Sequence, residues 1–117
     1  MAKTSFMFLF HGQTDAGLSP EQFQENLQQW LAWVDKLKNK GVYKGGEPLV
    51  PGGKVVSQKS GKIVIDGPYA ETKEQVGGFF LVEAASYEEA VEMAKDYPDF
   101  HLNGKVEIRE VMILPGS

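Results

Sequence analysis

The chain has 117 residues, which is the size of one domain and too short for two ordinary ones. Apolar residues make up 42% and charged residues 24%, a normal globular mixture that argues against intrinsic disorder. The formal net charge is −4 and no Lys/Arg cluster is present, so a basic nucleic-acid-binding module is disfavoured. The chain contains no cysteine, which excludes disulfides, thiolate catalysis and Cys-ligated metal sites.

No apolar run approaches the roughly 20 residues that span a bilayer. The apolar run near the start is too short for a secretion signal and lacks a cleavage site. We therefore expect one domain over residues 1–117, located in the cytoplasm, with neither a membrane nor a nucleic acid as partner.

The first predicted element is a strand over residues 4–10 that is apolar on both faces. Because side chains alternate along a strand, Phe6, Phe8 and Phe10 should point to one face. Met7, Leu9 and His11 should point to the other. A strand that is apolar on both faces is covered on both faces.

The next element is a helix whose start and end are marked in the sequence. Ser19 is the expected N-cap, Pro20 suits the first helical position, and Gln22 completes a capping box. The helix should end near Lys40 and Gly41, where glycine suits the position after the cap. Its predicted buried face is Phe23, Leu27, Trp30, Leu31, Val34 and Leu37. This pattern places Trp30 in the core and Trp33 at the edge of that face.

A strand over residues 42–50 is predicted next, followed by a hairpin. Two short β runs, 54–58 and 62–66, flank Ser60-Gly61, which is a hairpin signal. A polar loop from Gly67 to Gln75 then leads to a strand over 78–84 that is apolar on both faces. The preceding pair Gly77-Gly78 indicates a bulge or tight packing against a neighbouring chain segment, with close approach to a ligand as the alternative.

A second helix and a last strand complete the chain. Ser86 is the expected N-cap with Glu89 as its box partner, and Pro98 is expected to end the helix. The predicted inner face is Ala90, Val91, Ala94 and Tyr97. The last strand covers 105–114. Val106 and Ile108 are even-numbered whereas Val111 and Ile113 are odd-numbered, so either the strand has a bulge near Glu110 or both of its faces are covered there.

The order β-α-β, hairpin insert, β-α-β predicts an α+β fold of the ferredoxin-like, split βαβ type. Two right-handed crossovers place both helices on one face of the sheet. The opposite face still carries apolar side chains, and a large exposed apolar face is rare on monomers. The simplest cover is a second copy of the same sheet, so we expect a homodimer through the sheet face.

The segment from Asp66 to Phe79 resembles the signature of the DGPF branch of the YCII-related family. It starts Asp-Gly-Pro-Tyr, continues Glu-Thr-Lys-Glu from residue 71, and ends in Gly-Gly and an aromatic strand. Tyr69 stands where the branch usually has Phe. The resemblance implies a ferredoxin-like domain whose sheets face each other in a dimeric α/β barrel. It implies no assigned activity, although some members act on small aromatic or chlorinated compounds and others accompany extracytoplasmic-function sigma factors.

Other members of the family have a His–Asp pair that has been proposed as catalytic. By the resemblance, its histidine corresponds to Gln22 and its aspartate to Tyr97 in this sequence. Gln has no titrating proton, and Tyr has a pKa near 10. The resemblance therefore does not carry acid–base catalysis to this chain.

Polar residues of the signature are the main candidates for a ligand site. A carboxylate base and an ammonium that binds an anion are the functional interpretation, while a turn at Asp66 and a solvated loop are the structural alternative. His11, at the end of the first strand, is either a base at the barrel mouth or a histidine hydrogen-bonded to a loop carbonyl. The candidate ligand-binding residues are His11, Asp66, Tyr69, Glu71, Lys73 and Glu74. The spacing of the two histidines supports no metal site, and we expect no cofactor.

The sequence favours a small-molecule binding protein of uncertain catalysis, with its pocket at the mouth of the dimer barrel. One alternative is a weak lyase, isomerase or hydrolase that acts on a small substrate, for which an aromatic anion is a candidate. Another is a regulatory module associated with an extracytoplasmic-function sigma factor.

Overall fold

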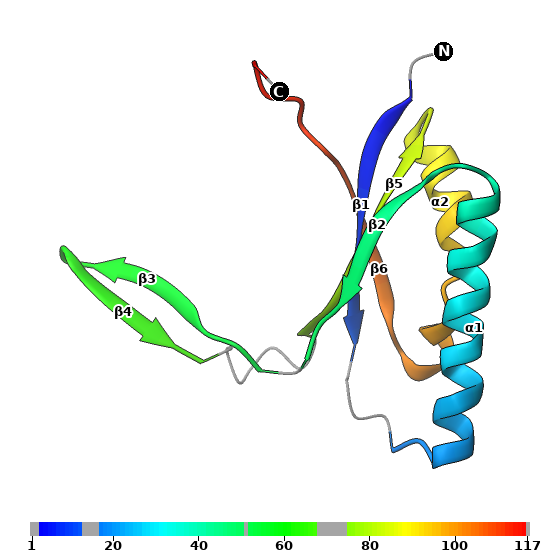
Figure 1. Cartoon of the computed structure of the whole chain (residues 1–117). Helices are drawn as coiled ribbons and strands as arrows, with labels where there is room; N and C mark the ends of the chain where they lie inside the picture. The colour runs from blue at the N-terminus through cyan, green and yellow to red at the C-terminus, as the bar shows by residue number, and fades with distance from the viewer. Residues whose placement is uncertain (1–2, 13–16, 51, 68–74, 117) are drawn as a thin grey trace.

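A four-stranded antiparallel sheet with two helices on one face forms the body of the protein (Figure 1). The computed structural model describes residues 3–12, 17–50, 52–67 and 75–116. The elements in chain order are β1 (Thr4–Gly12), α1 (Pro20–Asn39), β2 (Tyr43–Pro48), β3 (Val55–Lys59), β4 (Lys62–Asp66), β5 (Gln75–Ala84), α2 (Tyr87–Ala94), a 3-10 helix (Pro98–Leu102) and β6 (Lys105–Glu110).

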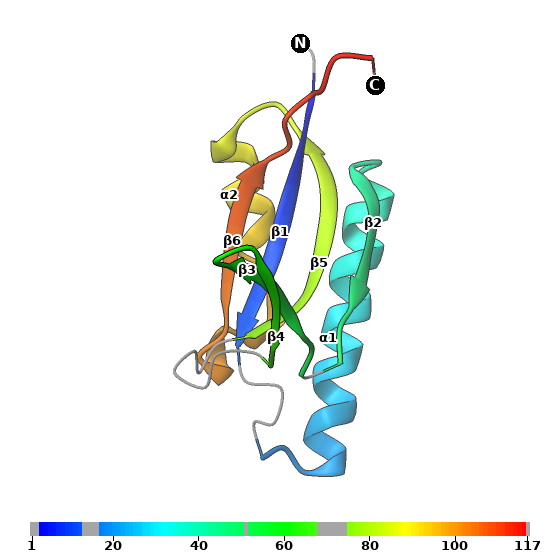
Figure 2. The same cartoon turned by 90° about the vertical axis from the view of Figure 1, so that its left-hand side faces the viewer.

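The strand order of the main sheet is β2-β5-β1-β6, and β3 and β4 pair with each other in a separate two-stranded sheet. All the pairings are antiparallel. This is the order that a ferredoxin-like arrangement requires, so the predicted α+β fold with a hairpin insert is confirmed in its element order. Figures 1 and 2 show both helices on the same face of the sheet, as the handedness of the crossovers predicts.

The start of α1 is built as the sequence predicts. The Ser19 hydroxyl accepts a hydrogen bond from the backbone N–H of Gln22 at 3.1 Å. The Gln22 side-chain oxygen accepts from the backbone N–H of Ser19 at 2.9 Å, which completes the capping box. The helix ends at Asn39, and Gly41 follows with a φ of 73°.

The predicted buried face of α1 is only partly correct. Trp33, expected at the edge, is only 3% exposed, while Phe23 and Leu31 are more than half exposed. Trp33 faces both the sheet and α2, and its indole N–H donates to the carbonyl of Met93 at 3.1 Å. The 20-residue helix reaches beyond the sheet at its N-terminal end (Figure 1), so its first turns have little to pack against. Helical periodicity describes a face but does not say how far the sheet beneath it extends.

α2 is shorter than predicted. Its N-cap is confirmed, since the Ser86 hydroxyl accepts from the backbone N–H of Glu89. The helix ends at Ala94 rather than next to Pro98, because the backbone N–H groups of the following residues donate to carbonyls three residues earlier and form a tighter turn than an α-helix. Met93 takes the buried position that we assigned to Val91, which is 44% exposed.

The last strand also ends earlier than predicted, at Glu110. The pairing of β6 with β1 has no register shift, so the bulge near Glu110, one of our two alternatives, is absent from this strand. The change of parity reflects the end of the strand, after which Met112, Ile113 and Leu114 are exposed.

The glycine pair Gly77-Gly78, near the start of β5, has the structural role that the sequence favoured. Phe10 pairs with Gly78 and His11 pairs with Val76, so Gly77 is the extra residue of a bulge. Gly78 packs tightly, because a Cβ there would lie 2.9 Å from the carbonyl oxygen of Glu47 on β2.

Candidate functional site

A cavity of about 470 Å³ lies between α1 and the sheet, at the end where β2 and β5 approach the first half of the helix. The lining is mostly apolar and aromatic: Phe10, Phe23, Asn26, Leu27, Trp30, Leu31, Val34, Tyr43, Gly46, Glu47, Pro48, Gly77, Gly78, Phe80 and Asp99. The apolar side chains that α1 leaves exposed therefore line a hollow rather than a flat surface.

Aromatic rings form one wall of this cavity. The ring centroids of Phe10 and Trp30 are 4.9 Å apart, and those of Phe10 and Phe80 are 4.8 Å apart. Both pairs meet edge to face, the arrangement that the ring quadrupoles favour. The neighbours hold these rings in place, so the wall is already formed in the unliganded chain.

Glycines keep the sheet side of the cavity open. A Cβ on Gly46 would collide with the carbonyl oxygen of Phe79, and a Cβ on Gly78 would press on Glu47. Close contact between β2 and β5 thus requires glycine on both strands. The cavity is bounded there by backbone instead of by side chains.

The polar groups of the lining are mainly hydrogen-bond acceptors. Asn26 Oδ1 is buried and has no hydrogen-bond partner, which is costly unless a ligand or water pairs with it. Asp99 accepts from the indole N–H of Trp30 at 3.1 Å and keeps further acceptor capacity. The charged residues among the described lining are the carboxylates Glu47 and Asp99.

Tyr43 is the hydroxyl donor among these polar groups. Burial raises the pKa of its phenol, and the charge of Glu47 raises it further. The phenol therefore keeps its proton at neutral pH. A ligand with donor groups is matched by the carboxylates and by Asn26, and a ligand acceptor can pair with Tyr43.

His11 does not line the cavity. It lies on the opposite face of the sheet, where its Nε2 is 2.8 Å from Glu107 Oε1. Arg109 Nη1 lies 3.3 Å from the other oxygen of the same carboxylate. The hydrogen bond from His11, and then the one from Arg109, lowers the pKa of Glu107. The partner of His11 is thus a carboxylate on β6 and not the loop carbonyl that we considered.

Asp66 does not line the cavity either. It is the last residue of β4, is exposed, and pairs with Val55 across the hairpin. Tyr69, Glu71, Lys73 and Glu74 lie outside the described residues, so their role stays a prediction.

The two positions that correspond to the family's proposed catalytic pair have structural roles. Gln22 is part of the capping box of α1. Tyr97 is buried in the aromatic cluster, where its ring stacks on Phe10 with centroids 5.5 Å apart. Burial, and then the charge of Asp99, raises the pKa of Tyr97. Its phenol stays neutral and is unsuited to act as a base.

Sequence reasoning missed several residues of the cavity, notably Asn26, Tyr43 and Asp99. Each is an isolated polar residue in a segment that we assigned to a structural element or a surface loop. The sequence offered one signal for the cavity. The first half of α1 carries Phe23, Leu27 and Leu31, which are more apolar residues than the helix needs to pack against the core.

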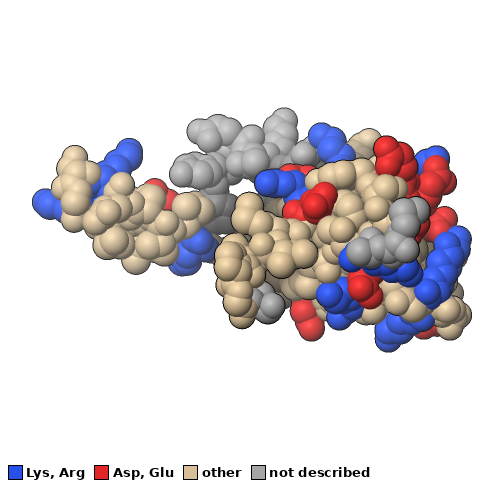
Figure 3. Space-filling view, turned by 90° about the horizontal axis from the view of Figure 1, so that it is seen from above, with Lys and Arg blue, Asp and Glu red and all other residues tan. Residues whose placement is uncertain are grey.

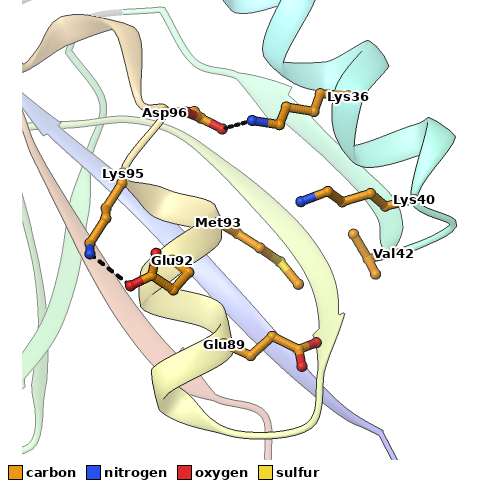
Figure 4. A pocket seen from close by; sticks show the side chains of 8 residues that line it. All are labelled: Lys36, Lys40, Val42, Glu89, Glu92, Met93, Lys95 and Asp96. Atoms are coloured by element: carbon orange, nitrogen blue, oxygen red, sulfur yellow. Dashed lines mark hydrogen bonds and ion pairs between the residues drawn. The ribbon is translucent and has the colours of Figure 1, made fainter.

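A second hollow, of about 590 Å³, lies on the surface between α1 and α2 (Figure 4). Lys36 pairs with Asp96, and Lys95 pairs with Glu92, each at 2.7 Å. Lys40 and Glu89 also line this hollow, so its positive and negative charges balance. Exposed pairs of this kind contribute little free energy. The apolar residues in the lining of this hollow are Val42 and Met93, and its other lining residues are charged.

Within residues 3–12, 17–50, 52–67 and 75–116, no group of three or more metal-ligating side chains lies close enough to hold an ion. The helices of that same part of the chain are not long and apolar enough to cross a membrane.

A family model described as "YCII-related domain" matches residues 5–114. An uncharacterized protein of Rhizobium meliloti (strain 1021) is 44% identical over 57 residues, which cover 47% of this chain and 46% of the relative. The matched region therefore spans about half the length of that relative.

Proposed function

This chain belongs to the YCII-related family, and we propose that it binds a small, largely apolar molecule in the cavity between α1 and the sheet. The observation that carries the proposal is the preformed aromatic cavity with the unpaired Asn26 oxygen inside the fold. A volume of about 470 Å³ lies within the range of roughly 300–1,000 Å³ that is typical of small-molecule sites.

The ligand that fits best is an aromatic molecule with hydrogen-bond donors, neutral or positively charged. Glu47 and Asp99 disfavour an anion, because like charges repel in a partly desolvated site. Trp30 and Phe80 provide ring faces and edges against which an aromatic group packs. Donors on the ligand would satisfy Asn26 Oδ1.

The positions of Gln22 and Tyr97 in the fold favour ligand binding over acid–base catalysis by the pair of residues that the family suggests. Gln22 is used to cap α1, and Tyr97 is held neutral in the core. Signature residues Tyr69, Glu71, Lys73 and Glu74 remain our proposed second set of ligand contacts, since Gly77, three residues after Glu74, lines the cavity.

We also propose that two copies associate through the face of the sheet that bears no helix. The apolar side chains on that face include Met7 and Leu9 on β1 and Phe79 and Leu81 on β5. All four are half-buried. Facing sheets would complete the burial of these side chains in a ferredoxin-like dimer. Sedimentation equilibrium over micromolar concentrations tests this, and a single species with the mass of one chain would contradict it.

A thermal-shift screen of aromatic amines, phenols and carboxylates tests the binding proposal. A ligand at 100 times its Kd adds about 2.7 kcal/mol to the free energy of unfolding. We expect stabilisation by amines and phenols and none by simple aromatic carboxylates.

Two variants locate the binding site of any ligand that the screen finds. Leu31→Trp fills the cavity, whereas Val91→Trp introduces the same side chain at an exposed site on α2 outside it. We expect Leu31→Trp to abolish the stabilisation and Val91→Trp to keep it. Equal binding by both variants would place the ligand elsewhere.

A further inference from the structure

The β3–β4 hairpin has an apolar face that the described chain does not cover. Val56 pairs with Ile65, and Gln58 pairs with Ile63, so the three apolar side chains share one face. Their exposed fractions are 63–65%. Val55 and Val64, on the other face, are half-buried. The face of the hairpin that carries Val56, Ile63 and Ile65 is thus the more solvent-exposed of its two faces.

A hairpin of this kind does not hold its shape alone. A two-stranded hairpin is marginally stable in water and needs a third strand or a packing surface. In the part of the chain that the structure describes, β3 and β4 pair with each other and with no strand of the main sheet. Figures 1 and 2 show the hairpin extending from the side of the sheet that faces away from the helices.

The whole chain is too extended for an isolated domain of its size. Its radius of gyration is 16.6 Å, against about 13.4 Å for a compact domain of this length. Its accessible surface is 8582 Å², against about 6,350 Å² for a compact monomer of the same mass. The surplus, about 2,200 Å², is of the size that each chain buries in a large permanent dimer.

Charge also favours a second copy of this chain as the partner. Residues 52–67 contain Lys54, Lys59 and Lys62 but only Asp66 as an acid, so their net charge is 3 − 1 = +2. The whole chain has a net charge of −4, which leaves −4 − 2 = −6 for the remainder. Figure 3 shows lysines at the far end of the hairpin and a largely uncharged surface along it. A basic arm and an acidic body attract each other between two copies.

Three further exposed apolar side chains lie toward the same side of the molecule as the hairpin. Met112, Ile113 and Leu114 follow β6 and are exposed, and Figure 1 shows this segment leaving the sheet on the side of the hairpin. A two-fold contact uses the same surface on both copies, so hairpin, sheet face and C-terminal segment would all be covered at once.

We infer that the β3–β4 hairpin is an arm that packs its Val56–Ile63–Ile65 face against the body of a second copy of this chain. The inference rests on the proposed dimer and adds the arm to it. Each chain would hold its partner with an element that has no packing surface of its own.

Charge substitutions on the two faces of the hairpin test the arm. Ile65→Lys places a charge on the apolar face, and Ser57→Lys places the same charge on the opposite face as a matched control. Desolvating a lysine in place of a buried isoleucine should weaken the dimer at least about tenfold in Kd by sedimentation equilibrium. Ser57→Lys should leave Kd within about twofold. An unchanged Kd for Ile65→Lys would overturn the arm.

A third variant separates failure of the arm from failure of the dimer. Leu81→Glu alters the open sheet face and leaves the hairpin intact. A dimer that is weakened by Leu81→Glu and indifferent to Ile65→Lys would retain the sheet-face contact and overturn the arm. A wild-type chain that stays monomeric at every concentration would overturn both.

Paramagnetic labelling detects the arm contact directly. The chain has no cysteine, so Lys62→Cys creates a unique site for a nitroxide near the end of the hairpin. Chain that carries the nitroxide but no ¹⁵N is mixed with ¹⁵N-labelled chain that carries no nitroxide. Any broadening of the ¹⁵N signals then arises from contact between two copies. We expect broadened amide signals in β1, β5 or residues 111–116 of the ¹⁵N chain. Absence of broadening in a mixture shown to be dimeric would overturn the arm.

Discussion

The two tryptophans of α1 give the sharpest test of how this fold is held together. Trp33 is buried, donates its indole N–H to the carbonyl of Met93, and packs on Phe80 with ring centroids 5.0 Å apart. Trp30 is half-buried, lines the cavity, and donates to Asp99. Replacing each with Phe removes one hydrogen bond and the same volume, so the two variants differ only in their surroundings.

Trp33→Phe should be the costlier change. It removes the indole hydrogen bond to the Met93 carbonyl, which costs about 0.5–1.5 kcal/mol. That carbonyl still accepts from the backbone N–H of Asp96 at 3.5 Å. The missing ring atoms leave a void that adds about 1–2 kcal/mol. The free energy of unfolding should therefore fall by about 2–3 kcal/mol. Trp30→Phe opens toward a cavity, and water can replace the indole at Asp99, so its cost should be about 1 kcal/mol or less.

Urea unfolding followed by far-UV circular dichroism measures both costs. Wild type and variants are compared at one protein concentration, since association would shift the midpoint. A lower midpoint at an unchanged slope reports a loss of stability alone. An equal or larger cost for Trp30→Phe would refute the assignment of Trp33 as the core tryptophan.

Three further predictions concern caps, packing and pH. Ser19→Ala should lower the free energy of unfolding by about 1 kcal/mol, because it removes the N-cap acceptor of α1, and urea titration against Ser60→Ala as a loop control would show a difference. Gly78→Ala should destabilise the chain more than Gly67→Ala, because a methyl at 78 meets the Glu47 carbonyl whereas Gly67 has open space around it, and equal melting temperatures would contradict this. Glu107 has a lowered pKa in the folded state, so its contribution to stability is present above its usual pKa of 4.5 and is lost as the pH falls through the folded value. Glu107→Gln should therefore flatten the dependence of melting temperature on pH below about 4.5, and an unchanged acid limb would show that the His11–Glu107 contact is not maintained in solution.

The order and type of the elements were predictable from the sequence because local rules specify them. The Ser19–Gln22 capping box and the Ser60-Gly61 turn act within a few residues, so no distant contact is needed to define them. The Gly77 bulge was predictable for the same reason, since few other roles suit a glycine pair at a strand start.

The cavity was not predictable because it depends on how far the elements overlap. Periodicity correctly placed Trp30 on the core face, where it packs half-buried against the core. It missed that Trp33 is the more buried of the two, because α2 covers Trp33 from the side. Asn26 and Asp99 are 73 residues apart in the chain and share the site only through the docking of the 3-10 helix near α1. His11 was placed correctly at a strand end, but alternation puts it on the face opposite to the cavity.

Methyl NMR can detect directly whether a small donor-bearing aromatic ligand binds between α1 and the sheet. Chemical shifts of ¹³C-labelled methyl groups are followed during titration with the strongest ligand of the thermal-shift screen. We predict saturable shifts at Leu27, Leu31 and Val34, which line the cavity. Methyl groups of Ile63 and Ile113, outside the lining, should not move. Shifts confined to Leu9 and Leu81 on the opposite sheet face would contradict the claim and place the ligand in the dimer barrel.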